Sequence, residues 1–99
     1  MFIVFLRFSA GRDQAAQLMQ AHKDWLQRGF DDGIFHLAGS LQPQAGGMIL
    51  ASGTTLAQLE ERVSNDPFVA QDVVRAEIVA VTPSKADPRL EFLLADMGS

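Results

Sequence analysis

The stretch MFIVFLRF, residues 1–8, decides the fold, because it is rich in β-branched and aromatic residues and therefore predicts a strand. Successive residues of a strand point to opposite faces, and this stretch is apolar at both sets of positions. One face carries Phe2, Val4, Leu6 and Phe8, and the other carries Ile3 and Phe5. A strand of this kind must be covered on both faces, so a layer of structure is expected on each side of it.

Outward from this strand, the apolar pattern predicts five further elements. Helical spacing is found over residues 13–30 and from residue 56 to residue 63, and short apolar runs predict strands over residues 34–41, 48–52 and 75–82. The order β-α-β-β-α-β is typical of the ferredoxin-like α+β fold, in which both helices cover one face of an antiparallel sheet.

Local signals set the ends of these elements. The polar segment 9–13 is expected to cap the first helix, and Thr54 or Thr55 to cap the second. The segment 42–47 contains Pro43, Gly46 and Gly47 and predicts a turn. Asn65-Asp66-Pro67 ends the second helix, because a residue that precedes proline is disfavoured in the helical region.

Ninety-nine residues are enough for one domain, predicted here over residues 1–83. In a ferredoxin-like sheet the face without helices is open, yet the first and last strands are apolar on both sides. The simplest cover is the same face of a second copy, so the sequence predicts a homodimer. The tail, residues 84–99, is expected to pack on the domain or on the partner subunit.

Composition excludes several classes of function. Twelve acidic and eight basic residues give a net charge of −4 without a basic run, which argues against nucleic-acid partners and against anionic membrane surfaces. The chain has no cysteine, so thiol catalysis and thiolate metal sites are excluded. No apolar run approaches the roughly 20 residues of a membrane span, and a cytoplasmic protein is expected.

Two residues are candidates for catalysis. His22 lies within the apolar stripe of the first helix, and Asp66 follows the second helix. Because the two helices lie side by side in this fold, their side chains are expected to meet, and a carboxylate bonded to one imidazole nitrogen makes the other a general base. Each residue also has a structural interpretation: a histidine satisfied by a carbonyl group, and an aspartate that forms a turn or caps the next half-helix.

Further candidates surround this pair. Trp25 and Phe68 flank it, as core aromatics or as walls of a substrate site. Ser40 is a candidate substrate-binding residue on the second strand, and Arg7 either holds an anionic substrate or pairs with a surface carboxylate. His36 is interpreted as a sheet-face residue. Two histidines without a metal-binding spacing predict no metal site, and no cofactor motif is present.

The run Ala21-His22-Lys23-Asp24-Trp25-Leu26, followed by Gly33, Gly39, Gly46-Gly47 and Asp66-Pro67-Phe68, resembles the YCII-related (YciI-like) domain family over residues 1–83. The resemblance implies a dimeric ferredoxin-like α+β barrel with a His–Asp pair as active site, in which His22 is the base and Asp66 orients it. The few members of this family with an assigned activity remove halide from chlorinated hydroxyquinone-type aromatics.

The residues leave more than one function open. The first is a cofactor-independent lyase or isomerase, in which His22 abstracts a proton from a small cyclic or aromatic acid. The second is a non-catalytic dimeric module that binds a metabolite or peptide, in which His22 and Asp66 are structural. The third is a cofactor-free monooxygenase of the same barrel type, which would need a pocket wide enough for a ring system.

Overall fold

The computed structural model describes residues 1–96 and has the predicted α+β architecture. Its strands and helices are β1 (Phe2–Phe8), α1 (Ala15–Asp31), β2 (Phe35–Leu41), β3 (Gly46–Ala51), α2 (Leu56–Ser64), α3 (Pro67–Ala70) and β4 (Val74–Ala80). Two 3₁₀ segments, η1 (Arg12–Gln14) and η2 (Pro88–Asp96), precede α1 and follow β4. The short helix α3 occupies the segment after Asp66, where the sequence indicates a short turn or a further half-helix.

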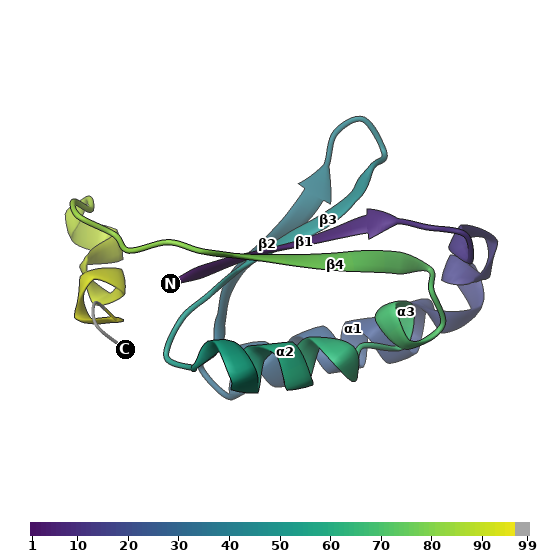
Figure 1. Ribbon diagram of the computed structural model, residues 1–99, viewed down its shortest axis with the longest axis horizontal. Coiled ribbons are helices and arrows are strands. Elements are labelled where there is room, and N and C mark those ends of the chain that lie inside the picture. The colour runs from purple at the N-terminus through teal and green to yellow at the C-terminus, as the bar shows by residue number, and fades with distance from the viewer. Residues whose placement is uncertain (97–99) are drawn as a thin grey trace.

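The four strands form one antiparallel sheet in the order β2-β3-β1-β4. This order, with β1 and β3 in the centre, confirms the ferredoxin-like prediction. The helices α1, α2 and α3 lie together on one side of the sheet, below it in Figure 1, and α1 packs against α3. The fold therefore brings the middle of α1 beside the segment that follows α2.

The two faces of β1 differ as its alternation requires. Phe2, Val4 and Leu6 are buried beneath the helices, whereas Ile3 and Phe5 point to the other face and are partly buried. The core on the helix side is otherwise built from both the sheet and the helices and includes Trp25, Phe35, Ile49, Ala51, Leu59, Val63, Phe68, Val73 and Val74.

The two main helices begin differently. In α2 the Thr55 hydroxyl accepts a hydrogen bond from the Gln58 amide and the Gln58 side chain accepts one from the Thr55 amide, which is the predicted cap completed as a capping box. The expected side-chain cap of α1 is wrong. Its first residue is preceded by η1, which turns the chain instead, and Gln14 at the N-cap position makes no side-chain bond.

The predicted turn over residues 42–47 is too long, because Gly46 and Gly47 belong to β3. They lie opposite Arg7 and Leu6 in the sheet. Gly46 has a φ of +129°, and a Cβ atom at this position would overlap the carbonyl oxygen of Leu6. Only glycine allows the two backbones to approach this closely. The hairpin glycines therefore extend the sheet under α1 rather than end it.

The open face of the sheet is apolar, as the two-sided strands predict. Ile3, Phe5, Met48 and Leu50 are partly buried there, and Leu37 is 56% exposed. Within residues 1–96, no helix is both long enough and apolar enough to cross a membrane.

The C-terminal segment η2 lies beyond the end of β4, near the N-terminus and apart from the three helices (Figure 1). The Phe92 ring meets the His36 ring edge-on at 4.9 Å between centroids, and Leu93 is buried. The tail thus contacts its own domain through Phe92, while its last part, residues 97–99, lies outside the described residues.

Candidate functional site

The structure brings His22 and Asp66 together. His22 lies in the middle of α1 and Asp66 directly precedes α3, and the packing of these two helices places His22 Nδ1 at 2.8 Å from Asp66 Oδ1. The Asp66 side chain is fully buried, and the His22 side chain keeps 15% of its surface exposed. The carboxylate therefore lies behind the imidazole, and the imidazole separates it from solvent.

Asp66 also caps α3. Its Oδ1 accepts a second hydrogen bond, at 3.0 Å, from the backbone N–H of Phe68. Pro67 at the first helical position has no N–H, so the Phe68 amide is the first that needs a cap. When Asp66 is ionised, its Oδ1 accepts hydrogen bonds from both the Phe68 amide and His22 Nδ1, and the imidazole proton then lies on Nδ1. The two interpretations of Asp66 from the sequence are thus compatible in one residue.

Two aromatic rings hold the imidazole in place. The Phe68 ring is nearly parallel to the His22 ring, with centroids 4.1 Å apart and an interplanar angle of 3°, and Trp25 stacks at 5.7 Å. Phe68 is positioned by the cap that Asp66 provides, so one local motif sets both the hydrogen bond and the stacking partner. The orientation of the His22 side chain is consequently determined by the fold.

A cavity of about 340 Å³ lies beside this histidine, between α1, the β2–β3 hairpin, β1, α3 and β4. Its walls are mostly apolar, and its lining residues are Leu6, Phe8, Met19, His22, Lys23, Leu26, Ala38, Gly39, Ser40, Gly46, Gly47, Phe68 and Val74. Within residues 1–96, Asp66 Oδ2 is the only buried side-chain nitrogen or oxygen without a partner. His22 Nε2, which makes no hydrogen bond, is therefore accessible. Apolar walls with a few polar groups are typical of a small-molecule site.

The other predicted site residues are distributed over three places. Ser40 and Phe68 line the cavity with His22. Trp25 is buried behind His22, where its Nε1 donates to the carbonyl oxygen of Arg62 at 3.0 Å, as expected of a core aromatic. Arg7 lies on the opposite face of the sheet and pairs with Glu77 at 2.6 Å, with about half of each side chain exposed. Arg7 thus forms the surface pair and does not reach the cavity.

Lys23 is a cavity residue that the sequence pattern does not reveal. The helical pattern places it on the polar side of α1, yet it lines the cavity next to His22. A helical wheel gives the direction of the Lys23 side chain about the helix axis. It does not give the tilt of α1 over the β2–β3 hairpin, and this tilt decides whether the side chain reaches the edge of the cavity. Gly47 was expected in a turn, and as part of β3 it lines the cavity as well.

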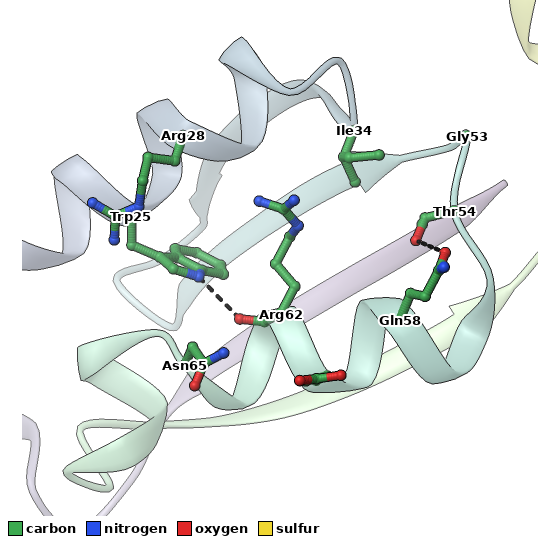
Figure 2. Close-up of a pocket in the computed structure, with 9 residues that line it drawn as sticks. Trp25, Arg28, Ile34, Gly53, Thr54, Gln58, Arg62 and Asn65 are labelled. Carbon is green, nitrogen blue, oxygen red and sulfur yellow. Dashed lines mark hydrogen bonds between the residues drawn. The ribbon is translucent and has the colours of Figure 1, made fainter.

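A larger groove, of about 600 Å³, lies between α1 and α2 (Figure 2). Trp25 lies at this groove, and its indole nitrogen is directed to the Arg62 carbonyl group. Some of its polar groups are engaged with neighbours, since Arg62 pairs with Asp32 at 2.8 Å and Thr54 bonds to Gln58. Because neither His22 nor Asp66 borders it, we assign the candidate site to the smaller cavity.

His36, interpreted from the sequence as a sheet-face residue, lies at an irregularity in β2 between Phe35 and Leu37. Its Nε2 is 2.6 Å from the hydroxyl group of Ser52. Neither histidine is part of a metal cluster, since no group of three or more His, Cys, Asp or Glu side chains in residues 1–96 is placed to hold a metal ion.

By its fold, this protein is an antiparallel βαββαβ domain of the ferredoxin-like class. A histidine–carboxylate pair lies beside its small apolar cavity. The chain belongs to the YCII-related domain family, whose model matches residues 1–85. This confirms the family resemblance seen in the sequence. No curated protein sequence matches the chain significantly.

The fold is similar to that of a solved structure, 5-chloro-2-hydroxyhydroquinone dehydrochlorinase (TftG) from Burkholderia phenoliruptrix AC1100 in complex with 2,5-dihydroxybenzoquinone. The two chains superpose with a TM-score of 0.66 over 82% of this chain and 93% of the other, at 13% sequence identity. At this identity the similarity establishes the shared fold.

Proposed function

We propose that this protein is a cofactor-independent enzyme, a lyase or isomerase that removes a proton from a small cyclic or aromatic acid. The observation that carries the proposal is the hydrogen bond of 2.8 Å between His22 Nδ1 and Asp66 Oδ1 at the wall of a cavity large enough for one ring-sized molecule. His22 is the general base, and Asp66 is the residue that positions it.

The chemistry follows from the state of the imidazole. With its proton on Nδ1, His22 presents the lone pair of Nε2 to the cavity and accepts a proton from a substrate C–H or O–H group. The positive charge that forms on the ring is stabilised by the Asp66 carboxylate, which lies in a buried environment where the attraction is weakly screened. The electron pair left on the substrate either expels a leaving group or moves to a neighbouring carbonyl oxygen.

Proton transfer of this kind is balanced without an electron acceptor. In an elimination the imidazolium releases its proton after the leaving group departs, and in an isomerisation it returns the proton to a different substrate atom. Removal of hydrogen chloride is an elimination, and the similar structure is named as a dehydrochlorinase. The shared fold supports the view that such a reaction suits this scaffold, while the particular substrate is set by the residues of each cavity.

We further propose that the protein acts as a homodimer through the open face of its sheet. Leu37 and Val79 are exposed there, beside the partly buried Ile3 and Phe5. An apolar face of this extent is commonly covered by a partner, and a two-fold dimer is the most frequent solution. Light scattering after size exclusion is expected to give twice the chain mass, and Phe5→Glu is expected to give a monomer; a wild-type monomer at micromolar concentration would contradict the proposal.

The test of catalysis follows proton exchange directly. The protein is incubated in deuterated water with small hydroquinones, including chlorinated ones, and with cyclic keto acids, while deuterium uptake and chloride release are recorded. We expect His22→Gln to lower the rate by about 10²- to 10⁴-fold, the usual contribution of a general base. His36→Gln is the matched control and should retain the wild-type rate.

The alternative, a non-catalytic binding module, predicts a different result in the same experiment. Compounds would bind at the cavity, yet wild type and His22→Gln would show the same exchange as the buffer. Asp66→Asn adds a second criterion, because it keeps an oxygen for the Phe68 amide but removes the charge behind the imidazole. A catalytic pair requires this variant to be slow although it remains folded.

A further inference from the structure

The cavity beside His22 is lined by one basic side chain other than the histidine, Lys23, and by no acidic side chain. The carboxylate of Asp66 lies behind the His22 imidazole and does not line the cavity. In a chain with a net charge of −4, this lining is a local region with a basic and no acidic side chain. Such a region favours a ligand that carries a negative charge.

Lys23 has no partner of its own within the described part of the chain. The residues three and four positions away on α1, where a helix places an ion-pair partner, are Met19, Gln20, Leu26 and Gln27. The neighbouring Asp24 accepts a hydrogen bond from Gln20 at 2.9 Å. Within residues 1–96, the ion pairs involve other residues, and no hydrogen bond of the Lys23 ammonium group is found.

We propose that Lys23 is the anion-binding residue of this cavity, so that the ligand is a small planar ring bearing an ionised carboxylate or phenolate group. This inference rests on the proposed function, which places the substrate in the same cavity. Phe8, Leu26 and Phe68 provide apolar surface for the ring, and the Ser40 hydroxyl group is the remaining uncharged side-chain donor in the lining.

The arrangement of α1 supports a shared ligand for Lys23 and His22. The two are consecutive residues and both line the cavity, so one ring-sized molecule can reach both side chains. An ammonium group on a flexible four-carbon side chain tolerates different positions of the anion. Lys23 is therefore a binding residue that selects for charge, and His22 remains the group that moves a proton.

A matched pair of probes tests this assignment. The ligands 4-hydroxybenzoate and 4-hydroxybenzamide have the same ring and nearly the same shape but differ in charge, and their affinities are measured by NMR titration of the Ser40 and Gly47 amide signals. Wild type is expected to prefer the benzoate by roughly ten- to a hundredfold, in line with a hydrogen bond to a charged group. Lys23→Met should remove this preference while leaving the affinity for the benzamide unchanged.

The chain contains its own control, because Lys85 is its only other lysine and is exposed in the tail. Lys85→Met changes the net charge equally and should keep the wild-type preference. An unchanged preference in Lys23→Met, or no shift of the cavity signals with either probe, would overturn the assignment. If the preference depends on Lys23 while His22→Gln leaves proton exchange unchanged, the proposed catalysis is wrong and the anion site stands.

Discussion

The two histidines of this chain have the same side chain and each lies within hydrogen-bond distance of an oxygen, yet their surroundings differ. His22 meets the carboxylate of Asp66 through Nδ1, at 2.8 Å, and stacks face to face with Phe68. His36 meets the hydroxyl group of Ser52 through Nε2, at 2.6 Å, and contacts Phe92 edge-on.

The difference between the two partners determines what each histidine can do. A buried carboxylate is only an acceptor when ionised, so it fixes the tautomer of His22 and stabilises the protonated ring. A hydroxyl group donates or accepts and therefore fixes neither. His22 also keeps Nε2 accessible at a cavity, whereas the Nε2 atom of His36 is bonded to Ser52. A histidine becomes a general base through these surroundings rather than through its own chemistry.

The largest difference between the two histidine sites is expected in the free energy of unfolding, when the oxygen partner of each histidine is removed. Asp66→Ala leaves the buried Phe68 N–H group without an acceptor and breaks the bond to His22, so we expect a loss of about 3 kcal/mol in the free energy of unfolding. Ser52→Ala removes one hydroxyl group and should lower it by about 1 kcal/mol. Urea denaturation of the two variants measures both values, and equal losses would contradict the assigned difference.

The sequence predicted the positions of His22 and Asp66 better than it predicted which other residues line the cavity. The helical stripe that contains His22 and the proline after Asp66 place both residues on elements that adjoin in a ferredoxin-like fold, so their proximity follows from topology. The position of Arg7 did not follow, although strand alternation separates it from Leu6. Because β1 is apolar on both sides, its sequence does not show which side the helices cover.

Other features depend on tertiary contacts that local patterns do not encode. Gly46 is typical of a turn in isolation, and only the approach of Leu6 across the sheet makes it part of β3. Lys23 has the pattern of a solvent-exposed residue, and the hairpin beneath α1 makes it a cavity residue. Helical and strand periodicity therefore predict the scaffold, whereas the shape and charge of the cavity arise from the way its layers meet.

A second prediction concerns the tautomer of each imidazole. In wild type, nitrogen NMR of labelled histidine is expected to show the His22 proton on Nδ1. Asp66→Asn keeps an oxygen at the position shared by the Phe68 amide and His22 Nδ1 but removes its charge, so the preference for the Nδ1 proton should weaken and the population with the proton on Nε2 should grow. The His36 signals should remain as in wild type. A His22 spectrum that is identical in both proteins would mean that Asp66 does not set the tautomer.

A third prediction separates the surroundings of His36 from those of His22. Phe92 is 49% exposed, so Phe92→Ala removes only part of a ring contact and should lower the free energy of unfolding by about 1 kcal/mol or less. The ring proton signals of His36 should shift because the aromatic ring beside it is lost. Equal shifts of the His22 signals would show that the tail also acts on the candidate site.

The smallest effect is expected at Arg7, and it tests whether the site is confined to the helix side of the sheet. Arg7 pairs with Glu77 on the opposite face, where both side chains are about half exposed, so Arg7→Gln should change the free energy of unfolding by about 0.5 kcal/mol or less. The signals of both histidines should be unaffected, and the preference for 4-hydroxybenzoate should remain that of wild type. Lys23→Met is the comparison, since it removes the same charge from the other face. If Arg7→Gln instead weakens the binding of the anion as Lys23→Met does, then the ligand is held from both faces, and a cavity formed by one protomer is not the complete site.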